Sequence, residues 1–343
     1  MNAIERNIRR IDAFQQRHPA LAFPFGVVKK FGDDQAGNLA ALVAYYGFFS
    51  LFPLLLVFVT VLGFVLHGNT KLEKSILDSA LAQFPIIGDQ IKKNVHSISG
   101  SGVALAVGIL GTLWGGLGVM QAMQTAMNRV WDVPLRERPN FWKSRIRALL
   151  MLVLLGISSI ASAIVAGVAA AGGGSLLAKI GGYALSLALN LGVFMLAFRI
   201  LTARRLTWGD VFPGALVAAV GWLVLQAAGG YIVGHQLKSA NQVYGLFAMV
   251  IGLLTWMYLG AQLTLYAAEV NVVRKERLWP RSLTQPPLSE ADRRTYRRAA
   301  MAEQRRPEED VEVRFDDETV GDSHLEDRRE RERIEDVEEP SDP

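Results

Sequence analysis

The stretch that decides the fold is Leu39 to Leu66, LAALVAYYGFFSLFPLLLVFVTVLGFVL, which contains no charged residue. A bilayer core of about 30 Å needs on the order of 20 helical residues, because lipid offers the backbone no hydrogen-bond partner. This stretch is therefore expected to cross a membrane as a helix. Pro53 removes a backbone donor near its middle, so a kink is expected there.

Five further apolar stretches follow the first one along the chain. Together the expected spans are about 39–66, 103–127, 148–170, 181–198, 211–233 and 243–268. These lengths predict an all-α fold and a polytopic membrane protein, with a six-transmembrane-helix bundle over residues 39–273.

The connections between these spans alternate in their content of Lys and Arg. The N-terminal arm, the second and fourth connections and the stretch after the last span carry nineteen Lys and Arg, against six in the other connections. Short cytoplasmic connections of membrane proteins are enriched in Lys and Arg. With an even number of spans, both termini are expected to be cytoplasmic.

Three segments are expected to lie outside the bundle. Residues 1–38 form an amphipathic N-terminal arm, which either lies on the membrane surface or packs on the ends of the bundle. Residues 67–102 form an external amphipathic connection that either covers the bundle as a lid or lies among the lipid headgroups. Residues 274–343 form a charged cytoplasmic tail that is expected to be mostly disordered from about Thr284, since it has few apolar residues to bury.

The second span carries a face of small residues followed by polar ones. Gly108, Gly111, Gly115 and Gly118 recur at helical spacing, which favours close packing of another helix. Gln121, Gln124 and Asn128 continue toward the expected cytoplasmic end. They indicate either a polar cavity or hydrogen bonds between helices.

The sixth span carries a polar stripe along most of its length. Thr255, Tyr258, Gln262 and Glu269 share one face, which predicts that this face looks into the protein or a hydrated path. Glu269 lies in the last turn and is expected to pair with a basic residue such as Arg129 or Arg145. A structural ion pair is favoured over a role in proton coupling.

Several chemistries lack their residues in this sequence. The chain has no cysteine, and its five histidines are scattered without metal-ligand spacing. No phosphate-binding loop and no nucleophile elbow occurs. We therefore expect no cofactor, no metal, no nucleic-acid partner and no enzyme activity.

Specific segments resemble the YihY/BrkB family of bacterial inner-membrane proteins, and the YhjD-like branch in particular. They are ALVAYYGFFSLFPLLL at Ala41 to Leu56, AMNRVWDV at Ala126 to Val133, RPNFWKSR at Arg138 to Arg145, and Ala268, Glu269 and Asn271. Family members often have glycine where this chain has Ala268. The resemblance implies six helices in the bacterial plasma (inner) membrane. Members of the family were once called ribonuclease BN. This chain lacks the metal-binding cluster that such a hydrolase would need, so we do not expect that activity.

The resemblance also implies a role in envelope integrity or virulence, and the YhjD-like branch is associated with export of lipopolysaccharide precursors. We expect transport of a lipid or lipid-linked amphipathic molecule; alternatives are a scaffold that recruits envelope-biogenesis partners through its tail, and a membrane-bound hydrolase. Candidate path-lining residues are Tyr45, Tyr46, Ser50, Pro53, Gln121, Gln124, Asn128, Thr255, Tyr258, Gln262 and Glu269, with Arg129, Arg138, Trp142 and Arg145 as the cytoplasmic rim.

Overall fold

The computed structural model describes residues 3–65, 102–171, 176–235, 237–285 and 287–315. In these ranges every regular element is a helix. The α-helices are α1 (Ala3–Arg17), α2 (Pro19–Asp33), α3 (Ala36–Val65), α6 (Gly102–Val130), α7 (Phe141–Ala171), α8 (Leu176–Leu201), α9 (Trp208–His235), α10 (Leu237–Lys275) and α11 (Glu290–Ala302), and a 3-10 turn covers Leu135–Glu137.

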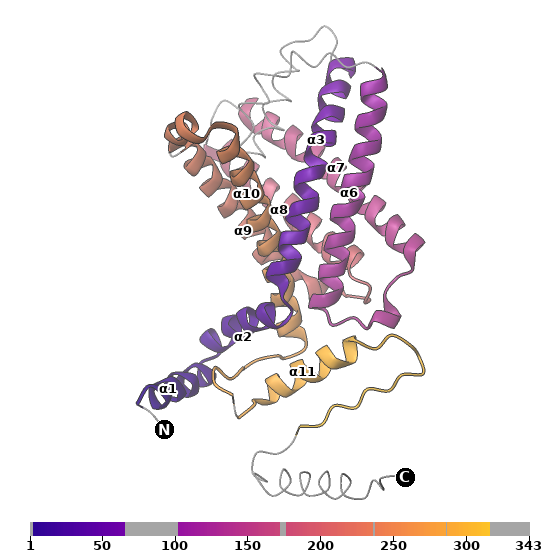
Figure 1. The fold of residues 1–343 in the computed structure, drawn as a ribbon. Helices are drawn as coiled ribbons and strands as arrows, with labels where there is room; N and C mark the ends of the chain where they lie inside the picture. Colours follow the sequence, from indigo (N-terminus) through magenta and orange to yellow (C-terminus); the bar gives the residue numbers. More distant parts are fainter. Residues whose placement is uncertain (1–2, 66–101, 172–175, 236, 286, 316–343) are drawn as a thin grey trace, which may run out of the picture.

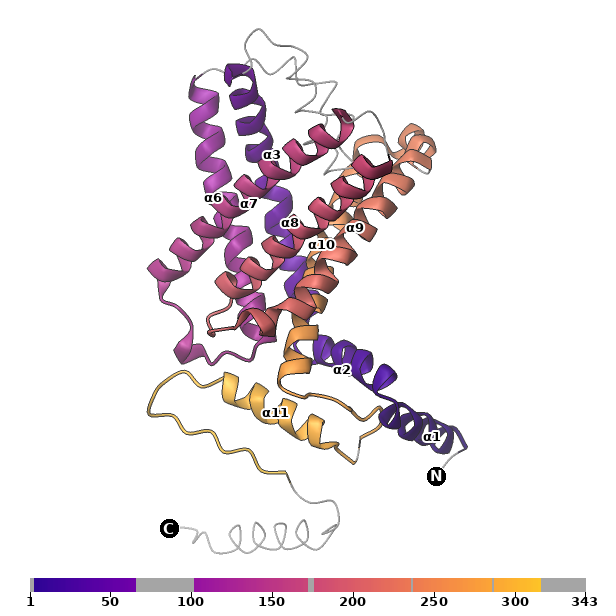
Figure 2. The same cartoon turned by 180° about the vertical axis from the view of Figure 1, so that it is seen from behind.

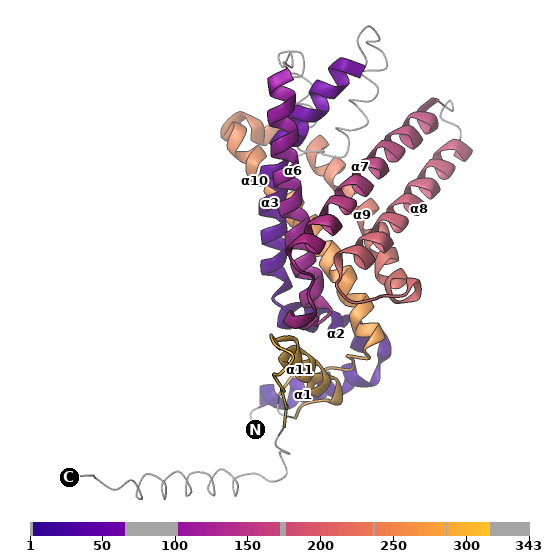
Figure 3. The ribbon, with the colours of Figure 1, turned by 90° about the vertical axis from the view of Figure 1, so that its right-hand side faces the viewer.

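Six long helices form the body of the molecule. α3 lies along α6, α9 along α10, and α7 along α8 (Figures 1 and 2). α1, α2 and α11 all lie at one end of this body, which we call the α2–α11 end (Figure 1). Away from that end, α7 and α8 lean away from α3 and α6 (Figure 3).

The long helices coincide with the expected spans, which confirms the all-α fold. Over their described residues, four helical segments are long and apolar enough to cross a membrane: Phe141–Ser162, Ile180–Leu201, Trp208–Gly229 and Val250–Lys275. Ala36–Leu51 is a shorter apolar helical segment. A count of six spans and a cytoplasmic position for both termini remain predictions.

The glycine face of α6 packs against α3. A Cβ on Gly115 would lie 2.8 Å from Ser50 Cβ, and one on Gly111 would lie 2.9 Å from Pro53 Cβ. A Cβ on Gly118 would lie 2.8 Å from Tyr46 Cδ1. The backbones therefore approach so closely that no larger residue fits without movement. α3 contains Pro53 and bends along its length (Figure 3).

Among the described side chains, the largest buried apolar residues gather toward the α2–α11 end. They are Trp131, Met127, Phe198, Leu265, Leu278 and Val272, none more than 2% exposed. The helices α6, α8 and α10 converge there, and their ends are joined by packing as well as by polar contacts. This end therefore holds the charged groups described below in fixed positions.

The expectation of a disordered tail from Thr284 is wrong for residues 290–302, which form α11. Ser289 and Asp292 make reciprocal capping bonds at its N-terminus, an arrangement that satisfies backbone donors the helix cannot use itself. Ala291, Thr295 and Ala302 are buried. The missing apolar residues are replaced by ion pairs. Residues 316–343 lie outside the described residues.

The other two outer segments have different outcomes. The N-terminal arm forms α1 and α2, and the α1 side chains Ile11 and Phe14 are 60% and 57% exposed while Asp12 and Gln15 are buried. The polar side of α1 therefore faces the protein, and its apolar side faces away. The external connection expected at 67–102 lies outside the described residues except for its last residue, Gly102.

Candidate functional site

A buried ion cluster lies where α2, α6 and α10 meet. Lys30, whose side chain is completely buried, donates from Nζ to Asp34 Oδ2 at 2.5 Å and to the carbonyl of Val130 at 3.2 Å. Its Nζ also lies 3.4 Å from Asp132 Oδ1. Asp34 and Asp132 are themselves nearly inaccessible. A buried ammonium group requires such partners, because transfer from water costs several kcal/mol.

Local chain geometry brings these residues together. Lys30 is in the last turn of α2, and Asp34 follows it at helical spacing, so the two side chains meet. Asp132 directly follows Trp131 after the end of α6 and has a φ of 49°. Asp tolerates this left-handed conformation better than most residues. The chain turns away from the axis of α6 at Asp132, and the Asp132 carboxylate lies beside Lys30 of α2.

Lys30 and Asp34, the cluster members before the first expected span, have shifted pKa values. Burial alone would lower the pKa of Lys30, but the carboxyl groups of Glu269, Asp34 and Asp132 outweigh it and raise that pKa. Burial raises the pKa of Asp34, against the opposing effect of Lys30, and Asp132 raises it further. Lys30 is therefore firmly cationic, whereas Asp34 is held in a site that disfavours its negative charge.

Glu269 lies in this cluster, from the last turns of α10. It is 0% exposed, and neither of its carboxylate oxygens has a hydrogen-bond donor. Its charged neighbours are Lys30, Asp34 and Asp132. The expected pairing with Arg129 or Arg145 is wrong, because α2 packs against the end of α10 and places Lys30 there instead.

Arg298 of α11 covers the outer side of the cluster. It donates from Nε to Asp132 Oδ2 at 3.0 Å and from Nη1 to Glu276 Oε2 at 2.8 Å. Glu276 also receives a bond from Arg204 Nη1 at 2.9 Å. Helix α11 thereby joins the turn after α6 to the end of α10.

A second set of bonds centred on Asp292 attaches α11 to α2. The completely buried Asp292 carboxylate accepts hydrogen bonds from Lys29 Nζ at 2.9 Å, from Arg281 Nε at 2.5 Å and from the Ser282 N–H at 3.0 Å. Arg281 also bonds Asp33 at 2.8 Å. Burial alone would raise the pKa of Asp292, but these donors together lower it well below its ordinary value.

Five of the other ten candidate path-lining residues contact a neighbouring segment. Gln124 exchanges hydrogen bonds with Ser144 of α7 at 3.0 and 3.1 Å. Asn128 Oδ1 accepts from the Ala203 N–H at 2.7 Å. Tyr46, Ser50 and Pro53 meet the glycine face of α6.

The polar stripe of α10 is only partly enclosed. Gln262 Nε2 donates to Tyr258 Oη at 2.9 Å within the helix, and both side chains are half-buried. Thr255 is exposed, as are Tyr45 of α3 and, less so, Tyr46; Gln121 of α6 is half-buried. The structure therefore brings Glu269, but not the whole stripe, into the ion cluster.

The expected rim residues lie at the α2–α11 end with separate partners. Arg129 pairs with Glu303 at 2.7 Å. Arg138 Nε donates to Val133 O at 3.3 Å, and burial, with Arg129 nearby, lowers its pKa. Arg145 lies over the Phe141 ring, and Trp142 is 72% exposed.

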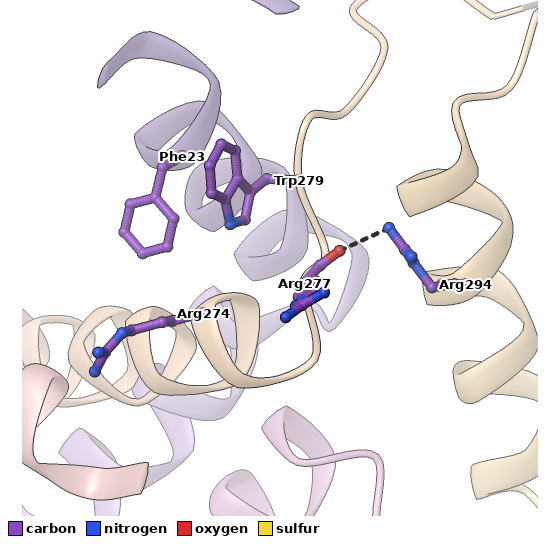
Figure 4. A pocket seen from close by; sticks show the side chains of 5 residues that line it. All are labelled: Phe23, Arg274, Arg277, Trp279 and Arg294. Carbon is purple, nitrogen blue, oxygen red and sulfur yellow. Dashed lines mark hydrogen bonds between the residues drawn. The ribbon is translucent and has the colours of Figure 1, made fainter. Parts of the chain in front are cut away.

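A separate cavity of about 600 Å³ lies beside the end of α10. Figure 4 shows its lining: Phe23 of α2, Arg274 and Arg277 at and just after the end of α10, Trp279, and Arg294 of α11. Phe23 and Trp279 meet edge to face at 5.9 Å. Arg294 Nη2 donates to the carbonyl of Arg277 at 2.9 Å. The cavity thus combines three guanidinium groups with two aromatic rings.

Sequence reasoning missed Lys30, Asp34 and Asp132 as one cluster. In the sequence Lys30 is one of the positive charges that flank the first span, and its spacing to Asp34 indicates an ion pair. Asp132 lies in a segment that supports the family resemblance, but nothing local tells that it meets α2. Phe23 is far in sequence from the other four cavity residues, so only the fold brings it to them.

These long apolar helices, with a charged end and a buried carboxyl group, are those of a helical integral membrane protein. The chain belongs to the family described as virulence factor BrkB, whose profile matches residues 27–291. The resemblance to the YihY/BrkB family is thereby confirmed.

Named relatives cover most of the chain. Inner membrane protein YhjD of Escherichia coli is 24% identical over 74% of this chain and 81% of its own length. A UPF0761 membrane protein of Alteromonas mediterranea is 27% identical over 73% of this chain and 87% of its own length. Putative ribonuclease-like protein YfkH of Bacillus subtilis is 23% identical over 69% of this chain and 90% of its own length. No solved structure matches this chain.

Proposed function

We propose that this protein binds a lipid or lipid-linked molecule with an anionic headgroup and moves it between the leaflets of the bacterial inner membrane. The observation that carries the proposal is the cavity of Phe23, Trp279, Arg274, Arg277 and Arg294. In the described part of the chain, neither Arg274 nor Arg277 has a carboxylate partner for its guanidinium group. Both are therefore available to a ligand.

The chemistry of this cavity suits a phosphate-bearing headgroup. A guanidinium group binds phosphate through paired, charge-assisted hydrogen bonds. Tryptophan is favoured at the boundary between hydrocarbon and water, where one side of the ring meets lipid. The apolar segment Val250–Lys275 ends beside the cavity, so a lipid in the membrane could place its headgroup there.

The N-terminal helices support the same location. Ile11, Phe14, Leu21 and Val28 expose their apolar side chains along α1 and α2. Helices with an apolar face and Arg or Lys opposite lie in the membrane interface. We propose that this face lies on the inner leaflet, with the α2–α11 end in the cytoplasm, and that the stripe through Tyr258 and Gln262 lines the route between leaflets.

Reconstitution tests the proposal. Vesicles with the full chain and a headgroup-labelled anionic lipid are compared with protein-free vesicles, and lipid movement is followed by chemical quenching of the outer leaflet. A double variant, Arg274→Gln with Arg277→Gln, should slow movement roughly tenfold or more, because a hydrogen bond to a charged group contributes about 1.5–3 kcal/mol. The matched control, Lys143→Gln with Arg205→Gln, removes two exposed positive charges elsewhere and should leave the rate unchanged.

Two results would contradict the proposal. Equal rates with and without the intact chain would refute transport and favour a scaffold that supports the envelope by binding partners. Equal loss in the cavity variant and its control would show that general positive charge, rather than this cavity, attracts the lipid.

A further inference from the structure

The junction of α2, α6 and α10 contains more buried carboxyl groups than cations. Asp34, Asp132 and Glu269 provide three carboxyl groups, while Lys30 and Arg298 provide two positive charges. Arg298 lies on the outer side and is shared with Glu276. Full ionisation would therefore leave at least one negative charge uncompensated in a region closed to water.

The hydrogen bonds of the cluster show which carboxyl groups carry the excess negative charge. Lys30 and Arg298 both reach Asp132, and Lys30 also binds Asp34. Glu269 has no donor on either oxygen although it is completely buried, and the carboxyl group of Asp34 is one of its charged neighbours. Two ionised carboxylates are acceptors only and cannot bond each other, whereas one proton between them supplies the missing donor.

The groups that surround Glu269 supply no other donor for it. Lys30 comes from α2, Asp34 from the turn between α2 and α3, and Asp132 from the turn after α6. On α9, Gly214 directs its N–H to Asn271, and Asp210 pairs with Lys275. Tyr266, on α10 itself, stacks on Phe31 at 3.8 Å. Arg298 of α11 is directed at Asp132 and Glu276.

We infer that Glu269 and Asp34 share one proton, so that this junction is a proton-binding site within the membrane domain. A metal ion would need a different arrangement, and in the described part of the chain no set of three or more Asp, Glu, His or Cys side chains is grouped to hold one. The burial that raises the pKa of Asp34 acts in the same direction. Two carboxyl groups that cannot both ionise are a known source of such sharing.

Release of this proton has a structural consequence. It leaves two adjacent carboxylates facing a single ammonium group, which a water-free junction does not tolerate. We therefore expect proton release to weaken the packing of α2 against α10. This inference goes beyond lipid movement and holds whatever the cargo is.

Infrared spectroscopy of the purified full chain at neutral pH tests the inference directly, because the C=O stretch of a protonated carboxyl group is resolved from that of a carboxylate. We expect the wild type to show the band of one protonated carboxyl group. Glu269→Gln should abolish it. Asp34→Asn should abolish it too, although Glu269 is still present, because the remaining charges then balance. Glu290→Gln, at the exposed start of α11, is the matched control and should keep the band.

Two outcomes would overturn the inference. One is a wild-type spectrum without the protonated band. The other is a band that survives both Glu269→Gln and Asp34→Asn, which would place the proton elsewhere. The measurement needs no transport, so its result is independent of the vesicle experiment. A wild-type spectrum without the band overturns the inference even if a variant fails to fold, and one folded variant is enough to assign a band that is present.

Discussion

Replacement of Gly214 by alanine tests whether the close approach of α9 and α10 holds the bundle together. A Cβ on Gly214 would overlap the carbonyl oxygen of Ala267 and lie 2.5 Å from Asn271 Nδ2. The Gly214 N–H donates to Asn271 Oδ1 at 2.6 Å. Because the obstacle is backbone, no rotamer change relieves it, and the two helices must move apart.

The expected loss follows from three contributions. Overpacking a tight contact costs about 1–3 kcal/mol. Weakening the buried bond to Asn271 costs a further ~1–3 kcal/mol, since its oxygen is left without a donor. Alanine recovers about 1 kcal/mol through its higher helix propensity. The variant should therefore lose roughly 1–5 kcal/mol of stability.

Thermal unfolding of the purified full chain, followed by the fraction that stays monodisperse after heating, measures this loss. The control is Gly192→Ala on α8, where a Cβ would meet nothing within 4 Å; its unfolding temperature should stay the same or rise. The Gly214 variant should unfold several degrees lower, at roughly 2–4 °C for each kcal/mol. If both variants unfold at the same temperature, α9 and α10 do not require this approach.

Three further predictions concern the α2–α11 end. Because the pKa of Asp292 in the docked state lies below its value of about 4 in the unfolded chain, its contribution to docking is complete above pH ~4 and is lost as the pH falls further. Limited proteolysis after α10 should therefore increase on acidification. At neutral pH it should be faster for Asp292→Asn than for the wild type, whereas Glu290→Gln should not change it. Ser289→Ala should weaken docking by about 1 kcal/mol, seen as faster amide hydrogen exchange in α11; unchanged exchange would argue against the cap. Lys30→Met should destabilise the chain by about 3–5 kcal/mol, and the loss in thermal stability should shrink toward pH ~5 as carboxyl groups take up protons; a loss independent of pH would contradict the charge balance.

Local patterns predicted the helices well. The apolar stretches set the positions of α3 and α6 through α10, because each must satisfy its own backbone in lipid. The helices extend beyond these stretches, as in α7, which begins at Phe141, because helical hydrogen bonding continues into the charged flanks. The glycine spacing likewise indicated a close neighbour for α6, although not which helix it would be.

The ion cluster and α11 could not be predicted in this way, because they depend on long-range contacts. Lys30 and Asp132 are far apart in sequence, and only the folded chain brings them to Glu269. A composition rule expects a segment with few apolar residues to be disordered. It does not foresee that Asp292 and Arg298 meet fixed partners of opposite charge.

The ion pair between Lys29 and Asp292 also constrains how the chain can be threaded through a bilayer. Lys29 Nζ lies 2.9 Å from Asp292 Oδ1, so the two residues lie at the same end of the molecule. The contact predicts that the polypeptide between them traverses the bilayer an even number of times. This prediction is independent of the distribution of positive residues.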